Sequence, residues 1–247
     1  MISVNVEHDF ESWRACARRL LQLKVSPDAV IWSGSTQGVL YASASTTPST
    51  SAEMRVPAKF IRLAEVVACY DGAEKWPLLY RILFRISFEN KNLLNIESDV
   101  DVRAARLMEK SVSRDIHKFH AFVRFRKIEA DGDEIYAAWH EPQHWCVERA
   151  TPFFERRFGA MKWSIFTPKG CAHWDLEKLR FSAPADRSMA PAADEIEDFW
   201  RLYYRSIFNP FRLNVKTMKR ELPVRHWATL PEADLIPELV RQAAAAE

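Results

Sequence analysis

The stretch SVSRDIHKFHAFVRFRKIEADGDEIYAAWH, residues 111–140, contains the change of periodicity that decides the fold. In its first part the apolar residues recur every three or four positions, which predicts the end of an amphipathic helix over residues 100–120. The spacing then becomes two, and the turn sequence ADGD separates strands predicted over residues 121–128 and 134–140. The chain therefore passes here from a helix into a β-hairpin.

The sequence on both sides of this stretch completes an α+β pattern. A second hairpin is expected from residues 162–167 and 171–175, with a further strand at 179–182. Helices and the two N-terminal strands follow from the same periodicities, at residues 2–6, 10–24, 29–32, 57–70, 78–88, 142–158, 194–208, 215–222 and 233–246. We predict helices packed around a small antiparallel sheet of two hairpins, with a small N-terminal α/β element.

Two segments have the composition of linkers. Residues 42–53 are rich in Ser and Thr, and residues 182–193 are rich in Ala and Pro. The predicted organisation is an N-terminal element at 1–41, a linker at 42–53 and a main domain at 54–247, in which 182–193 is an internal loop.

The bulk composition is that of a globular protein without a membrane span. The chain has 247 residues, 48% of them hydrophobic and 28% charged, with a formal net charge of +2. Its four cysteines show no CxxC spacing, and no leader or long apolar run is present in the sequence. We expect a cytoplasmic protein that has no membrane association and no cofactor.

Charge is segregated along the predicted helix 100–120. Its polar face is a basic stripe without acids, with His117 projecting among the cations Arg103, Arg106, Lys110, Arg114 and Lys118. The stripe is either a contact for phosphates or the ordinary solvated face of an amphipathic helix. Asp115 falls on the apolar face and therefore needs a partner.

A second basic block follows near the C-terminus. Residues 200–227 contain seven Lys or Arg and a single acid, interleaved with aromatic residues. Phosphate contacts beside stacking rings are typical of proteins that bind single strands or a distorted duplex. Alternatively, the rings belong to the core and the cations surround it.

The histidines raise the questions of metal binding and catalysis. His117 and His120 are spaced like helical metal ligands, and His140 and His144 like a second pair, but Pro142 interrupts that second spacing. We therefore predict no metal site. A general acid–base site formed by Asp115, His117 and His120 stays open as an alternative.

Four motifs resemble a bacterial family of DNA metabolism proteins. They are SRDIHKFHAFVRFR, EPQHWCVERATPFFERRFGAMKWSIFTPKGCAHWD, WRLYYRSIFNPFRLNVKTMKRELPVRHW and LPEADLIPELV, and the resemblance covers residues 56–240. It implies a role in DNA repair or modification beside a radical-SAM DNA-repair protein as partner. A similar domain occurs fused to uracil-DNA glycosylase-type modules.

We expect a DNA-binding accessory protein that holds nucleic acid for a partner enzyme. The predicted contacts are Arg106, Lys110, Arg114, His117, Lys118, Arg124, Arg126, Arg149, Trp163, His173, Trp174, Arg205, Asn209, Arg212, Lys216 and Lys219. An exposed Trp163, Trp174 or His173 would stack on an extruded base. The alternatives are a lyase, glycosylase or nuclease, and a scaffold that docks its partner through the acidic segment at 194–198.

Overall fold

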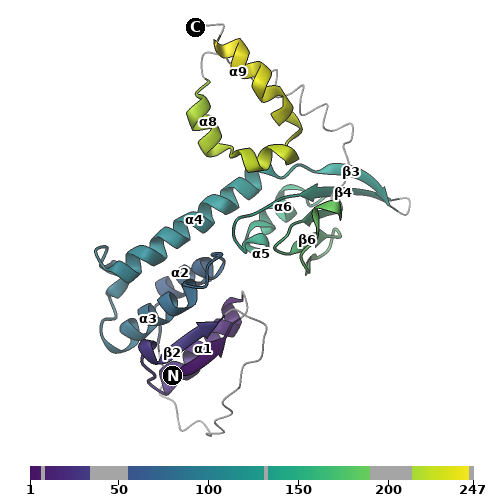
Figure 1. Cartoon of the computed structure of the whole chain (residues 1–247). Helices are drawn as coiled ribbons and strands as arrows, with labels where there is room; N and C mark the ends of the chain where they lie inside the picture. Colours follow the sequence, from purple (N-terminus) through teal and green to yellow (C-terminus); the bar gives the residue numbers. More distant parts are fainter. Residues whose placement is uncertain (7–8, 34–54, 131–132, 190–212, 245–247) are drawn as a thin grey trace. The chain divides into compact units, whose positions relative to one another are not determined.

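The computed structural model of the chain describes residues 1–6, 9–33, 55–130, 133–189 and 213–244 (Figure 1). They belong to two compact units, Met1–Asp115 and Ile116–Glu247. The division lies inside one long helix, α4 (Val100–Phe122). Both units combine helices with strands, so the predicted α+β class is confirmed.

The first unit contains β1 (Ile2–Asn5), α1 (Phe10–Gln22), β2 (Val30–Ser33), α2 (Ala58–Ala68), α3 (Lys75–Phe88), the start of α4, and 3₁₀ turns at Pro27–Ala29 and Leu93–Asn95. β1 and β2 pair in parallel, with Ile2 beside Val30, and α1 connects them as predicted. Trp13 of α1 lies 6.5 Å from Phe60 of α2 and 6.1 Å from Trp76 of α3, measured between ring centroids. The N-terminal element therefore shares one hydrophobic core with α2 and α3.

Helix α1 illustrates how local sequence sets an element of this unit. Asp9 caps the helix, because its carboxylate accepts the backbone N–H groups of Glu11 and Ser12 at 3.1 and 2.8 Å. The helical period then places one apolar face toward the core, formed by Trp13, Ala17, Leu20 and Leu21.

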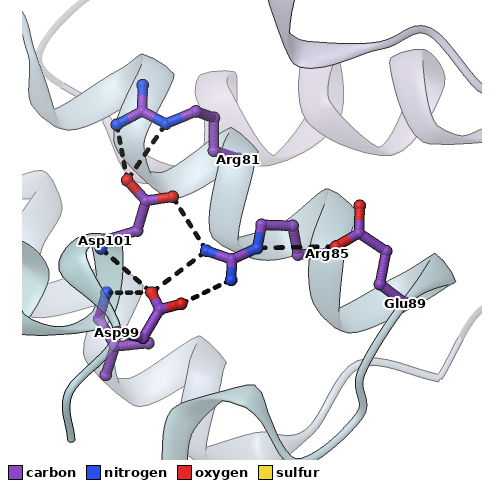
Figure 2. A network of polar contacts seen from close by, with 6 residues as sticks. Arg81, Arg85, Glu89, Asp99 and Asp101 are labelled. Atoms are coloured by element: carbon purple, nitrogen blue, oxygen red, sulfur yellow. Dashed lines mark hydrogen bonds and ion pairs between the residues drawn. The ribbon is translucent and has the colours of Figure 1, made fainter. Parts of the chain in front are cut away.

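A network of charged side chains joins the end of α3 to the start of α4 (Figure 2). Arg85 donates to both carboxylate oxygens of Asp99, at 3.1 and 2.5 Å, and to Asp101 at 3.1 Å. Arg81 donates twice to the other oxygen of Asp101, at 2.9 and 3.2 Å. Glu89 lies 3.7 Å from Arg85 at the more exposed side of the network.

Asp99 also caps the N-terminus of α4. Its Oδ1 accepts the backbone N–H groups of Asp101 and Val102, both at 3.1 Å, in the first turn of α4. The hydrogen bond from Arg85 holds the pKa of Asp99 below its ordinary value. One carboxylate therefore caps α4 and binds α3.

Replacing Asp99 with alanine is expected to lower the free energy of unfolding by about 2 kcal/mol, because the helix cap and the charged hydrogen bonds are lost together. Asp99→Asn keeps a capping oxygen and should lose less. The matched control is Glu89→Ala, whose side chain is 59% exposed and whose loss should cost at most about 0.5 kcal/mol. Urea unfolding measures all three, and equal losses for Asp99→Ala and Glu89→Ala would contradict the assignment.

The second unit contains the rest of α4, β3 (Arg126–Ala130), β4 (Asp133–Trp139), α5 (Val147–Ala150), α6 (Pro152–Arg157), β5 (Trp163–Phe166), β6 (Cys171–Trp174), β7 (Leu179–Ser182), α8 (Val215–Glu221), α9 (Ile236–Ala244), and 3₁₀ turns at Arg187–Met189, Val224–Thr229 and Pro231–Leu235. The five strands form one sheet in the order β3-β4-β5-β6-β7. Both predicted hairpins are confirmed, and β7 pairs antiparallel with β6.

The expected purely antiparallel sheet is wrong, because β4 and β5 pair in parallel and the sheet is mixed. A parallel pair needs a long crossover connection, and the segment that carries α5 and α6 provides it. The alternation of polar and apolar residues along a strand indicates which residues share a face. It does not indicate whether the strand runs parallel or antiparallel to its neighbour.

Several element boundaries also differ from the predicted ones. β3 begins at Arg126 rather than at residue 121, because α4 continues to Phe122 and buries Phe119 completely. No helix starts at Pro142, and the first helix after β4 is α5. The helix expected at 233–246 is a 3₁₀ turn followed by α9, which starts next to Pro237, a residue suited to a first helical turn.

The C-terminal helices have a small core of their own. Leu230, Ala233 and Ile236 are buried together, and side chains from α8, α9 and the end of α4 pack against them. Residues 42–53 and the last four residues of the predicted internal loop, 190–193, lie outside the described residues. Among the helices that are described, none is long and apolar enough to cross a bilayer.

Candidate nucleic-acid interface

One residue from each strand of the five-stranded sheet lies in a single row across the second unit. Hydrogen-bonded register aligns Arg126, Ala137, Ser164, His173 and Arg180, in that order. Because aligned residues of neighbouring strands project on the same side of a sheet, the row places a guanidinium group at each edge strand. A hydroxyl and an imidazole lie between them.

The opposite face of the sheet is closed by α6 and neighbouring aromatic residues. Trp163 is 1% exposed, and its ring centroid lies 5.9 Å from that of Phe125 and 6.2 Å from that of Phe154. Trp174, on the same face, donates its indole N–H to the carbonyl of Gly159 at 3.1 Å. The expectation of an exposed Trp163 is therefore wrong, since its indole is part of the core.

His173 lies at the centre of the other face, termed the open face, which is exposed at Arg180, half-buried at His173 and buried at Ala137. Its Nδ1 lies 2.9 Å from the Ser164 hydroxyl on β5, and its Nε2 lies 2.9 Å from the Ser182 hydroxyl on β7. Partial burial lowers the pKa of His173 below its ordinary value of 6.5, so the ring is neutral at neutral pH. A neutral imidazole donates from one nitrogen and accepts at the other, which satisfies both serines.

A shallow depression of about 190 Å³ lies beside this row. The cations Lys162 and Arg180 line it together with Ser164 and His173. Ile135, Trp163 and Trp174 contribute to its largely apolar lining. Asp175 also lines it and pairs with Arg180 at 2.9 Å. The volume is below the roughly 300–1,000 Å³ usual for whole small-molecule ligands, so the depression is too small to enclose one.

The predicted basic stripe on α4 is only partly available. Arg106, Lys110 and Arg114 are exposed on the part of α4 that belongs to the first unit. However, Arg106 donates to Glu109 at 2.8 Å, so an acid that the stripe itself does not contain neutralises one of its cations. On the second unit's part of α4, His117 is exposed and Lys118 is half-buried.

The predicted catalytic set on α4 does not converge. Asp115 is 3% exposed and His117 is exposed, as expected for residues two positions apart, which lie about 200° apart around a helix. His120 contacts the carbonyl of Ala150 through Nε2 at 2.9 Å and stacks on Phe153, with ring centroids 4.3 Å apart. The burial of Asp115 follows the sequence pattern and separates it from the exposed His117, whereas His117 is near enough to His120 for its charge to help lower the pKa of His120, after burial.

Arg124, predicted as a phosphate contact, is used inside the second unit. Its guanidinium donates to the carbonyl of Ala121 at 2.7 Å, near the end of α4, and to the carboxylate of Glu232 at 2.8 Å. The side chains of Arg124 and Glu232 are only 15% and 5% exposed. This pair therefore ties the end of α4 to the 3₁₀ turn that precedes α9.

The remaining predicted contacts fall into two groups. Arg149 on α5 and Lys216 and Lys219 on α8 are exposed. Arg205, Asn209 and Arg212 lie outside the described residues, as does the acidic segment at 194–198. A single continuous basic groove that includes all of these segments stays a prediction.

The histidine pairs do not form a metal centre in the part of the chain that the structure describes, where no three His, Cys, Asp or Glu side chains are placed to hold an ion. His140 and His144 are both buried. His140 stacks instead on His226, with ring planes 2° apart and centroids at 5.3 Å.

The sequence predicted His173 and Arg126 as contacts, but it did not predict the other polar residues around them. Lys162 and Ser164 fall within one motif of the resemblance but have no chemical signature there, and Arg180 and Ser182 lie outside all four motifs. The usable signal is the pairing register, because Ser164 and Ser182 lie nine residues before and after His173 on its two neighbouring strands. That register is known only once the strands are paired.

The fold and this surface define an α+β protein with an open sheet face that carries cations, hydroxyls and an imidazole. Residues 73–232 match the model of a domain of unknown function, DUF4130, which is more than half of the chain, and the chain belongs to the DUF4130 family. Comparisons with curated proteins and with solved structures find no match.

Proposed function

We propose that this protein is a DNA-binding accessory protein of a bacterial DNA repair or modification system, and that it holds nucleic acid on the open face of β3–β7. The observation that carries the proposal is the row from Arg126 to Arg180 across all five strands. Four interstrand steps of about 4.8 Å separate the backbones of these two residues by about 19 Å.

The chemistry of the row suits a polyanion. Guanidinium groups bind phosphate through paired N–H donors, and hydroxyls and imidazole add further hydrogen bonds between them. Lys162, which lines the depression beside Arg180, adds a third cation to the two arginines of the row. An exposed sheet face can hold single strands, whose bases are free to spread.

The partner belongs to the same proposal. The resemblance to DNA metabolism proteins implies a radical-SAM repair enzyme acting on the nucleic acid that this chain holds. The four cysteines of the chain show no spacing for an iron–sulfur cluster, so the radical chemistry is assigned to the partner.

Binding to a labelled single strand and to the matching duplex, measured by fluorescence anisotropy between 50 and 200 mM salt, tests the proposal. Each phosphate contact on a single strand contributes about −0.7 to the slope of log affinity against log salt. The Arg126→Ala/Arg180→Ala variant is therefore expected to bind severalfold more weakly, with a slope shallower by about 1.4.

The control is Arg18→Ala, which removes an equally charged, exposed side chain from α1 in the first unit and should change neither quantity. Absence of binding at the lowest salt would reject the DNA assignment. Binding with an unchanged slope in the double variant would place the nucleic acid elsewhere on the protein.

A further inference from the structure

Ser164, His173 and Ser182 form a continuous chain of hydrogen bonds across β5, β6 and β7, with both nitrogen–oxygen distances at 2.9 Å. With its proton on Nε2, the imidazole donates to Ser182 and its Nδ1 accepts the Ser164 hydroxyl. A hydroxyl, a base within hydrogen-bond reach and a third group that orients the base are the arrangement of an activated nucleophile.

We propose that Ser164 is a nucleophile for phosphoryl transfer, that His173 is its general base, and that the substrate is a phosphodiester on the open sheet face. The substrate class rests on the proposed function. Ser164 is assigned the attack because it lines the depression, whereas Ser182 is the last residue of β7 and is not part of the lining.

The cations of the depression complete the site. Lys162 and Arg180 line the same depression as Ser164, so they would face the non-bridging oxygens of a diester bound there. Negative charge grows on these oxygens and on the leaving oxygen during attack, and fixed cations stabilise it. Asp175 holds Arg180 by an ion pair of 2.9 Å, which limits the positions that the guanidinium can take.

The reaction balances with water as the only co-reactant. The Ser164 oxygen forms a bond to phosphorus as the bond from phosphorus to the leaving oxygen breaks. The hydroxyl proton passes to Nδ1 of His173 and from there to the leaving oxygen, which departs as an alcohol. The intermediate is a diester in which phosphorus is bonded to the Ser164 oxygen and keeps its other ester oxygen. Water then attacks this phosphorus with the same imidazole as base and the Ser164 oxygen leaves and regains its proton, so that a diester and water become a monoester and an alcohol.

The state of the base fits this role. Burial lowers the pKa of His173, which leaves the imidazole unprotonated at neutral pH, as a general base requires. The rate of reaction at Ser164 should therefore be constant at neutral and alkaline pH. It should fall in acid as the ring takes up its proton.

An alkyl fluorophosphonate tests the nucleophile without any need for DNA binding, because attack by an activated serine displaces fluoride. We expect one adduct on the full chain, mapped to Ser164 by mass spectrometry and absent from Ser164→Ala. His173→Gln should react at least about 100-fold more slowly, and its rate should no longer fall in acid. Ser182→Ala should slow the reaction severalfold, and Ser113→Ala, an exposed serine of α4, should not.

No adduct, an adduct at another residue, or an unchanged rate in His173→Gln would overturn the proposal. The mapping in the unaltered chain does not depend on whether any variant folds. If Ser164→Ala and His173→Gln keep the thermal unfolding midpoint of the unaltered chain, their loss of reaction with the fluorophosphonate is not due to unfolding.

Bis(p-nitrophenyl) phosphate and a labelled oligonucleotide test the substrate class. We expect release of nitrophenol and covalent trapping of the oligonucleotide, both lost in Ser164→Ala, which should still bind the oligonucleotide. Labelling by fluorophosphonate without turnover of either diester would overturn the phosphodiester assignment and leave DNA binding intact. Turnover of the small diester without oligonucleotide binding would overturn the proposed function alone.

Discussion

Replacing Glu232 with leucine is expected to lower the free energy of unfolding of the second unit by about 3–5 kcal/mol. Glu232 accepts from Arg124 at 2.8 Å in a place where the two side chains are only 5% and 15% exposed. Once the carboxylate is removed, the guanidinium stays in an environment of low polarity without its counter-charge. A buried charge that has lost its paired carboxylate costs more than the pair itself contributes.

The Arg124→Met/Glu232→Leu double variant separates the pair from its surroundings. It removes both charges and should recover much of the stability, although the hydrogen bond from Arg124 to the Ala121 carbonyl, worth about 1 kcal/mol, is lost. The control is Glu221→Leu, which breaks the 2.8 Å contact with Arg220 where the side chains are 67% and 73% exposed, and should cost less than about 1 kcal/mol.

Urea unfolding followed by tryptophan fluorescence gives these free energies. A Glu232→Leu variant no less stable than Glu221→Leu would show that the buried pair does not hold the end of α4 to the C-terminal segment. A double variant less stable than Glu232→Leu would assign the stability to Arg124 alone.

The second large effect is loss of stability in acid through His140. Its side chain is fully buried, its ring centroid lies 4.5 Å from that of Phe119 and 5.3 Å from that of His226, and neither ring nitrogen has a hydrogen-bond partner among the described residues. Burial, followed by the charges of His226 and Arg225, lowers the pKa of His140 to about 3.

The direction of the effect follows from the two states. The unfolded chain takes up a proton on this residue as pH falls below the ordinary value of 6.5, whereas the folded chain resists protonation until about pH 3. The contribution of His140 to stability is therefore fully present above pH 6.5 and is lost as pH falls from there toward 3. Each pH unit in this window costs about 1.4 kcal/mol, or about 3 kcal/mol between neutral pH and pH 4.

The measurement is the difference in unfolding free energy between the unaltered chain and His140→Phe, determined from neutral pH down to pH 4. The difference should shift by about 3 kcal/mol in favour of the variant, because phenylalanine keeps an aromatic ring beside Phe119 and cannot take up a proton. His117→Phe, at an exposed position of α4, should follow the unaltered chain. Parallel curves for His140→Phe and the unaltered chain would show that His140 is not held neutral by the fold.

The candidate surface could be predicted only in part. Two of its members, Arg126 and His173, follow from their positions among basic and aromatic residues, yet Trp163 was placed on the surface although it is buried. Alternation separates the two faces of a strand without showing which one a helix covers. Here α6 covers the face that carries Trp163, and the face with His173 is the more exposed one, although Ala137 within it is buried.

Arg124 shows a different limit. It has the same charge as Arg126 and lies two residues away, so a local pattern treats them alike. The structure assigns Arg124 to an ion pair with Glu232, a residue 108 positions later in the chain. No property of the local sequence reports a partner at that distance.

The sequence by itself determined the α+β class, the helix that leads into the first hairpin, and the strands of both hairpins, because each depends on a repeat of side-chain polarity along a few turns or a few strand residues. Only the tertiary structure decided that β4 and β5 run in parallel, that Ser164 and Ser182 meet His173, and that Arg124 is buried. These features depend on contacts between residues far apart in the chain, whose energies arise from packing and pairing after the local elements have formed.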